Sequence, residues 1–166
     1  MKKEFYMDIR LLQHADQNEV VAIMKEHSLQ FPDFIIEKYP IRWSNYLNPT
    51  LENNKSRFYV AYNHRDEIVG HTGYIFNEQG IYEIVGVAVK KDCQRQGIGK
   101  ALIQTICRKV KELNESKLIL YTLGHVGNED TLTFYSDLGF DRVNDELDFF
   151  AIDFHRVTFR MNLENL

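Results

Sequence analysis

The apolar positions change their spacing several times along the chain, which predicts strands that alternate with helices. Residues 6–12, YMDIRLL, have the composition of a first strand. Apolar side chains recur near helical spacing between Val20 and Met24, so residues 14–27 are expected to form a helix with Asp16 as its cap. The chain therefore begins with one strand and one helix.

Three apolar runs in the middle of the chain predict consecutive strands. Residues 57–62 and 67–76 flank four polar residues and are expected to form a hairpin. Residues 81–89, IYEIVGVAV, are apolar on both faces except at Glu83, which is typical of a central strand covered on each side. Gly86 in this run predicts a bulge or a close approach of the backbone to another group.

Residues 31–49 differ from these runs because they carry all three prolines and several aromatic residues. Proline interrupts regular helices, so this segment is expected to form broken helices that act as a lid. Its aromatic side chains either line an apolar acceptor pocket or close a core; they are Phe34, Tyr39, Trp43 and Tyr46.

A glycine-rich turn leads into the next predicted helix, which begins close to Gly97. Its apolar stripe consists of Ile98, Leu102, Ile106, Val110 and Leu113. The first N–H groups of such a helix lack helical partners and lie at the positive end of the macrodipole, so an anion binds there readily. Gly97 and Gly99 allow close approach, and cations surround the turn: Lys90, Lys91, Arg95 and Lys100. Phosphate binding is expected, with a solvated surface loop as the alternative.

Two common phosphate-binding motifs do not fit this turn. A P-loop requires a glycine where Gln94 stands and a hydroxyl residue where Ala101 stands. A dinucleotide-binding fingerprint requires a third glycine where Leu102 stands. Nucleotide hydrolysis and dinucleotide chemistry are therefore not expected.

Composition narrows the class of protein further. The 166 residues are 44% hydrophobic and contain no linker or repeat, so one domain spanning 1–166 is expected. The net charge is -4 with no long basic run, which argues against nucleic acid. No long apolar run occurs, so a soluble, cytoplasmic protein without a membrane partner is expected. Cys93 and Cys107 have neither Cys-x-x-Cys spacing nor nearby histidines, which predicts reduced thiols and no metal site.

The glycine turn and a later motif resemble the GNAT superfamily of acyl-CoA-dependent N-acyltransferases. Gln94, Gly97 and Gly99 match the superfamily's Gln/Arg-x-x-Gly-x-Gly/Ala signature, and residues 128–140, NEDTLTFYSDLGF, are similar to its late motif. The resemblance implies an α/β fold with a mixed, mostly antiparallel central sheet, splayed between the fourth and fifth strands and flanked by helices. Residues 117–123 occupy the place of the fifth strand.

The resemblance also implies acetyl-CoA as the cofactor and assigns backbone contacts to it. The main chain of Val87, Ala88 and Val89 is expected to pair with the pantetheine arm, with the Val87 N–H at the oxyanion. The signature residue Gln94 and the N–H groups of the following turn are expected at the pyrophosphate; these are Arg95, Gln96, Gly97, Ile98, Gly99 and Lys100. Asn128 either contacts the cofactor arm or caps the helix that follows it.

Amine acylation requires a base and an acid, and the resemblance supplies one candidate for each. Glu83 is the candidate base, with a solvated or ion-paired glutamate as the alternative. Tyr135 is the candidate acid for the departing thiolate, with core packing as the alternative. Cys93, His71 and His125 are not expected to take part in catalysis.

The expected function is therefore transfer of an acetyl group from acetyl-CoA to a primary amine of a small molecule, peptide or protein. The amine attacks directly in a ternary complex. A non-catalytic acyl-CoA-binding module on the same fold is the alternative. The acceptor stays open, and residues 155–163 are a candidate for pairing across a homodimer.

Overall fold

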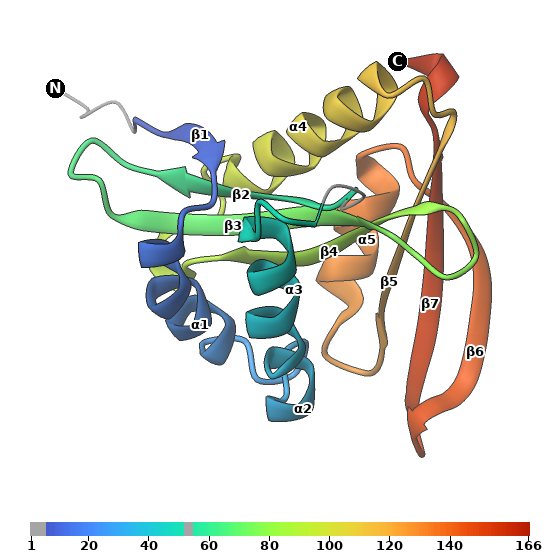
Figure 1. Cartoon of the computed structure of the whole chain (residues 1–166). Helices are drawn as coiled ribbons and strands as arrows, with labels where there is room; N and C mark the ends of the chain where they lie inside the picture. The colour runs from blue at the N-terminus through green and yellow to red at the C-terminus, as the bar shows by residue number, and fades with distance from the viewer. Residues whose placement is uncertain (1–5, 52–54) are drawn as a thin grey trace, which may run out of the picture. The chain divides into compact units, whose positions relative to one another are not determined.

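The computed structural model describes residues 6–51 and 55–166 (Figure 1). The chain divides into two compact units, and both β4 and α4 run through the two. The first unit comprises the described residues up to Ile75 together with Gly86–Ile106. The second comprises Phe76–Val85 and Cys107–Leu166. Among the described residues, none of the helices is both long and apolar enough to cross a membrane.

The strands form a mixed sheet in the order β1-β2-β3-β4-β5-β7-β6. The strands are β1 (Asp8–Leu11), β2 (Arg57–Tyr62), β3 (Ile68–Phe76), β4 (Tyr82–Val89), β5 (Lys117–Gly124), β6 (Asp141–Ala151) and β7 (Phe154–Asn162). The pairs β1/β2, β2/β3, β5/β7 and β6/β7 are antiparallel, whereas β4 and β5 are parallel. This arrangement confirms the predicted α/β fold with a mixed, mostly antiparallel sheet.

The helices follow the apolar periodicity of the sequence closely. They are α1 (Gln17–Lys25), α2 (Asp33–Ile36), α3 (Lys38–Leu47), α4 (Ile98–Glu112) and α5 (Glu129–Asp137). The predicted stripe of α4 is buried from Ile98 to Val110, but Leu113 lies beyond the helix and is 46% exposed. The expectation that Leu113 belongs to the core stripe is therefore wrong, because the helix ends before that residue.

Helices pack on both faces of the sheet in the first unit. His71 on β3 contacts the ring of Trp43 on α3, with ring centroids 5.5 Å apart. On the other face, Ile98 and Leu102 of α4 pack against Ala61 and Val69. The predicted broken helices are confirmed as α2 and α3. Their aromatic residues do not all behave alike: Tyr39 and Trp43 are buried in the core, Tyr46 is half-buried and Phe34 is exposed.

In the second unit α5 covers one face of the sheet, and Glu83 lies on the other face. Tyr135 of α5 packs against Phe159 of β7, which pairs with Leu120 of β5. Glu83 pairs with Ile119, the residue next to Leu120. Because neighbouring residues on a strand point to opposite faces, Glu83 lies on the face that is not covered by α5.

Three other expectations change in the structure. Asp16 precedes α1 but does not cap it; its carboxylate accepts hydrogen bonds from Arg10 and from the Gln13 N–H. The segment 155–163 lies mostly in β7, between β5 and β6, so its edges are already paired and the suggested dimer contact through it is wrong. Strand β6 was not predicted, because its side chains are almost all exposed and show no apolar alternation.

Candidate functional site

The glycine turn before α4 has the backbone geometry of an anion-binding site. Arg95 and Gly97 have positive φ angles of 64° and 81°, and the first helical bond runs from the Ala101 N–H to the Gly97 carbonyl at 3.0 Å. The N–H groups that precede Ala101 therefore lack helical acceptors. Buried Ile98 anchors the helix start in the core while the turn before it is exposed.

The turn is open on the side of Gly97. A Cβ added there would meet nothing within 4 Å. Consecutive N–H groups next to an open glycine in the left-handed region form the concave arrangement that holds phosphate groups. The backbone groups from Gln94 to Lys100 are therefore the ones that could hold a phosphate group of a cofactor.

The strand before the turn is held by hydrogen bonds in the first unit. The Lys90 N–H bonds to the Val69 carbonyl at 2.8 Å, and His27 Nε2 donates to the Val89 carbonyl at 2.7 Å. Val87 and Val89 are half-buried, whereas Ala88 is buried. One lone pair of the Val89 carbonyl is thus already used by His27, so a pantetheine arm would have to rely on the remaining backbone groups of Val87–Val89.

His71 is a structural residue, as the sequence indicates. It is fully buried, its Nδ1 donates to the Gly86 carbonyl at 2.7 Å, and its Nε2 accepts from Trp43 Nε1 at 3.1 Å. Burial lowers the pKa of His71 to about 4, although the bond to Gly86 opposes that shift. The imidazole is therefore neutral, and each of its two nitrogens makes a hydrogen bond.

Glu83 lies half-buried at the start of β4, and Asn77 Nδ2 donates to its Oε1 at 3.4 Å. The neighbouring Tyr121 donates from its hydroxyl to Gln79 Oε1 at 3.3 Å. Burial raises the pKa of Tyr121, and the negative charge of Glu83 raises it further. The Tyr121 hydroxyl therefore lies close enough to the Glu83 carboxylate for an electrostatic interaction. The sequence did not predict this relationship.

Tyr135 is 6% exposed and packs among aromatic rings. Its ring centroid lies 6.0 Å from that of Phe140 and 5.6 Å from that of Phe159. Glu83 and Tyr135 thus belong to the same unit but project from opposite faces of its sheet. They can serve one reaction only if the reacting group lies in the gap between β4 and β5, past their last pair, rather than on either face of the sheet.

Asn128 immediately precedes α5, but its side chain does not cap that helix. Instead Nδ2 donates to the Leu123 carbonyl at 2.5 Å, and the residue is 1% exposed. The expectation of helix capping is therefore wrong, because the amide faces back toward the end of β5. Nearby, His125 stacks on Phe154 with ring centroids 4.2 Å apart, and its buried Nδ1 has no hydrogen-bond partner among the described residues.

The uncovered face of the second unit carries a charged and aromatic group, the Arg156 cluster, which the sequence did not predict. Its members are Glu83, Tyr121, Glu146, Phe149 and Arg156. The guanidinium carbon of Arg156 lies 4.2 Å from the Tyr121 ring centroid and 4.0 Å from that of Phe149. Its Nε donates to Glu146 Oε1 at 2.8 Å. Two members belong to β6, so no local signal could have revealed the cluster.

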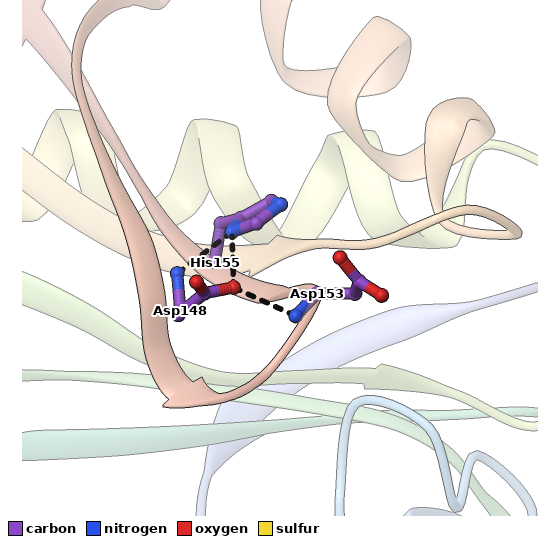
Figure 2. A group of neighbouring side chains, drawn as sticks. All are labelled: Asp148, Asp153 and His155. Carbon is purple, nitrogen blue, oxygen red and sulfur yellow. Dashed lines mark hydrogen bonds and ion pairs between the residues drawn. The ribbon is translucent and has the colours of Figure 1, made fainter.

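Two other groups in the structure resemble reactive sites but have simpler explanations. Asp148, Asp153 and His155 could together hold a metal ion (Figure 2). However, His155 Nδ1 already accepts from the Asp148 N–H at 2.8 Å, and Asp148 Oδ1 accepts from the Asp153 N–H at 2.7 Å. The trio thus ties the β6–β7 turn together. Burial and a bond to Asp92 raise the pKa of the Cys93 thiol, which opposes a nucleophilic role.

Solved structures with the same fold include several acetyltransferases. A GNAT-family protein from Desulfovibrio desulfuricans is 19% identical with a TM-score of 0.84, covering 95% of this chain and 99% of its own. A spermidine N-acetyltransferase chimera containing Vibrio cholerae sequence is 16% identical with a TM-score of 0.77, covering 96% of each chain. An aminoglycoside 6'-N-acetyltransferase bound to coenzyme A is 15% identical with a TM-score of 0.75, covering 94% and 97%.

No curated protein sequence matches this chain. Residues 20–140, however, match the acetyltransferase (GNAT) family. That range contains both the glycine turn and the whole of the late motif at 128–140, and the family uses acetyl-CoA as its acyl donor. The sequence match and the shared fold together establish that the chain belongs to the acetyltransferase (GNAT) family.

Proposed function

We propose that this protein transfers an acetyl group from acetyl-CoA to the primary amine of a small molecule, peptide or protein by direct attack in a ternary complex. The observation that carries the proposal is the open turn from Gln94 to Lys100 at the start of α4, with space beside Gly97. Acetyl-CoA supplies the activated thioester. The protein must position it, take a proton from the amine and return one to the thiolate.

Backbone groups of the first unit hold the donor in this proposal. The N–H groups from Arg95 to Lys100 bind the pyrophosphate, where the helix macrodipole adds favourable potential. Val87, Ala88 and Val89 pair with the pantetheine amides as an added strand would. The Val87 N–H stabilises the negative charge that develops on the thioester oxygen. Since backbone atoms do this work, side-chain substitutions at Arg95 or Gln96 should matter less than bulk at Gly97.

Glu83 takes the proton from the amine, directly or through water. An unperturbed primary amine has a pKa near ~10.4 and is mostly charged at neutral pH, so attack needs a base. Asn77 orients one carboxylate oxygen of Glu83 by donating to it at 3.4 Å. The half-buried position on β4 restricts solvent around the carboxylate.

Tyr135 protonates the departing thiolate from the other face of the sheet. For both side chains to reach one thioester, the reacting carbonyl must lie in the gap between β4 and β5, just past the pair of Ile84 with Leu120. This is the place at which the family resemblance puts the donor. Asn128, bonded to the Leu123 carbonyl, holds the start of α5 and thereby the position of Tyr135.

A non-catalytic acyl-CoA-binding module is the second candidate, and the packing of the Tyr135 ring in a core favours it. The two candidates share donor binding and differ in turnover. Binding must therefore be measured before catalysis.

Calorimetric titration with acetyl-CoA, coenzyme A, ATP and NAD tests the proposal, using the wild type and Gly97→Trp. The matched control is Gly80→Trp, which has a similar positive φ of 75° in another turn. We expect micromolar binding of both coenzyme A forms to the wild type and the control, and none to Gly97→Trp. Thiol release with a panel of amines then separates an enzyme from a binding module. Absence of acetyl-CoA binding to the folded wild type would overturn both candidates.

A further inference from the structure

Arg156 is held in one orientation by three neighbours. The Tyr121 and Phe149 rings lie 4.2 and 4.0 Å from its guanidinium carbon, so aromatic surface covers the guanidinium on two sides. Glu146 Oε1 takes one edge, 2.8 Å from Nε and 2.7 Å from Nη2. An arginine fixed in this way has lost much of its rotamer entropy before any ligand arrives.

One hydrogen-bonding direction of Arg156 is left over. Its Nη1 has no acceptor among the described residues, and the side chain keeps 25% of its surface exposed. The end of a guanidinium presents two parallel N–H groups, which match the two oxygens of a carboxylate. A purely structural cross-strand pair with Glu146 would need neither the two rings nor an exposed fork.

The fork lies near the proposed base. Glu83 pairs with Ile119, and Tyr121 is two residues further along β5, so these side chains share one face of the sheet. One strand spacing and two residues of rise put the Glu83 and Tyr121 Cα atoms about 8 Å apart. Tyr121 thus lies between an anionic group and a cationic one, and the pKa of its hydroxyl responds to both.

This pairing of charges fits a ligand of particular chemistry. An amine that approaches Glu83 and also carries a carboxylate would place that carboxylate toward Arg156. We infer that Arg156 is a specificity residue that binds the carboxylate of the acceptor, so that the acceptor is a small amino acid-like molecule. The inference rests on the proposed acetyl transfer, because it assigns the acceptor of that same site.

Other acceptor classes fit the cluster less well. A polycation would meet the fixed charge of Arg156 at the end away from Glu83, which costs affinity. A dianionic phosphate would suit the fork, but Glu83 and Glu146 leave the cluster with a net charge of about -1 and oppose a second negative charge. A monoanionic carboxylate satisfies the fork with the least repulsion.

The test compares amino acids with their carboxamides as acceptors, measuring kcat/KM from thiol release with acetyl-CoA. Because amidation also changes the basicity of the amine, the informative quantity is the change in the acid-to-amide ratio between the wild type and Arg156→Gln. We expect that ratio to fall by roughly tenfold to a hundredfold in the variant, the range for a hydrogen bond to a charged group.

Two further variants separate recognition from folding. Arg156→Lys keeps the positive charge opposite Glu146 but lacks the flat fork, so its ratio should fall nearly as far. Arg142→Gln is the matched control: this arginine lies on the neighbouring strand β6 and pairs with Asp145 at 2.6 Å, outside the cluster. Its ratio should equal that of the wild type.

The outcomes distinguish this inference from the proposed function. If acetyl-CoA binds and amines are acetylated, but the acid-to-amide ratio is the same in all four proteins, Arg156 does not bind the carboxylate of the acceptor. If acetyl-CoA binds and no carboxylate-bearing amine is acetylated, the inference also fails while donor binding stands. If acetyl-CoA does not bind at all, the proposed function fails and this inference falls with it.

Discussion

His71 donates a hydrogen bond from Nδ1 to the Gly86 carbonyl at 2.7 Å, which joins β3 to the distorted point of β4. Gly86 has a φ of 68° there, a conformation that other residues adopt only at a cost. The bond leaves Nε2 to accept from Trp43, so one buried imidazole connects α3, β3 and β4. The strand that carries the proposed donor contacts therefore has a defined, rigid support directly before Val87.

Replacing Gly86 with alanine should destabilise the protein by about 2–4 kcal/mol, combining left-handed backbone strain with overpacking. The added Cβ would lie 2.8 Å from Tyr39 Cε1 and 2.9 Å from His71 Cε1. Urea denaturation measures the change. Gly97→Ala is the control, because its φ is 81° but its Cβ would meet nothing within 4 Å. Equal losses in the two variants would show that packing around Gly86 is unimportant.

The neutral state of His71 predicts that stability falls in mild acid. Its pKa is about 4 in the folded protein and near 6.5 in the unfolded chain, so between these values the unfolded chain binds more protons. Stability is then constant above pH 6.5 and falls as the pH drops toward 4. From pH 7.5 to pH 5 the loss from this one group should be about 2 kcal/mol.

His71→Gln isolates this contribution. Glutamine does not titrate, so the variant should be less stable than the wild type at pH 7.5 but lose about 2 kcal/mol less on acidification to pH 5. Denaturant midpoints at the two pH values, measured for both proteins, give the comparison. Parallel pH dependences would mean that the pKa of His71 is the same in the folded and the unfolded protein.

Glu83→Gln should reduce kcat by roughly a hundredfold or more if Glu83 is the general base, because that is the usual contribution of such a group. Acetyl-CoA affinity should not change, since no donor contact is assigned to the Glu83 side chain. Glu112→Gln, an exposed glutamate near Lys109 at the end of α4, serves as the control. An unchanged kcat for Glu83→Gln would assign proton removal to water or another residue.

Asn128→Ala should cost about 1–3 kcal/mol, because the buried Leu123 carbonyl would lose the amide that bonds to it at 2.5 Å. If that bond holds α5 in place for Tyr135, turnover should fall more than donor affinity. Thermal unfolding and calorimetry together test both statements. Asn144→Ala, at an exposed position of β6, should stay within about 0.5 kcal/mol of the wild type. A change in stability of similar size for Asn128→Ala would show that the bond to the Leu123 carbonyl contributes little to stability.

Local patterns in the sequence were sufficient for most of the elements. The helical spacing from Ile98 to Val110 predicted α4, and the glycines before it predicted the exposed turn. The apolar run at 57–62 predicted β2 without error. These predictions succeed because the period of apolar residues and the dihedral freedom of glycine act over a few residues.

The sequence by itself determined most of the strands and helices, the glycine turn before α4 and the family motifs. Only the tertiary structure decided which groups face each other: that Asn128 bonds back to Leu123, that β7 lies between β5 and β6, and that Arg156 meets Tyr121. The reason is physical. Such contacts depend on strand order and register between distant segments, and a side chain carries no local signal of the partner it will meet.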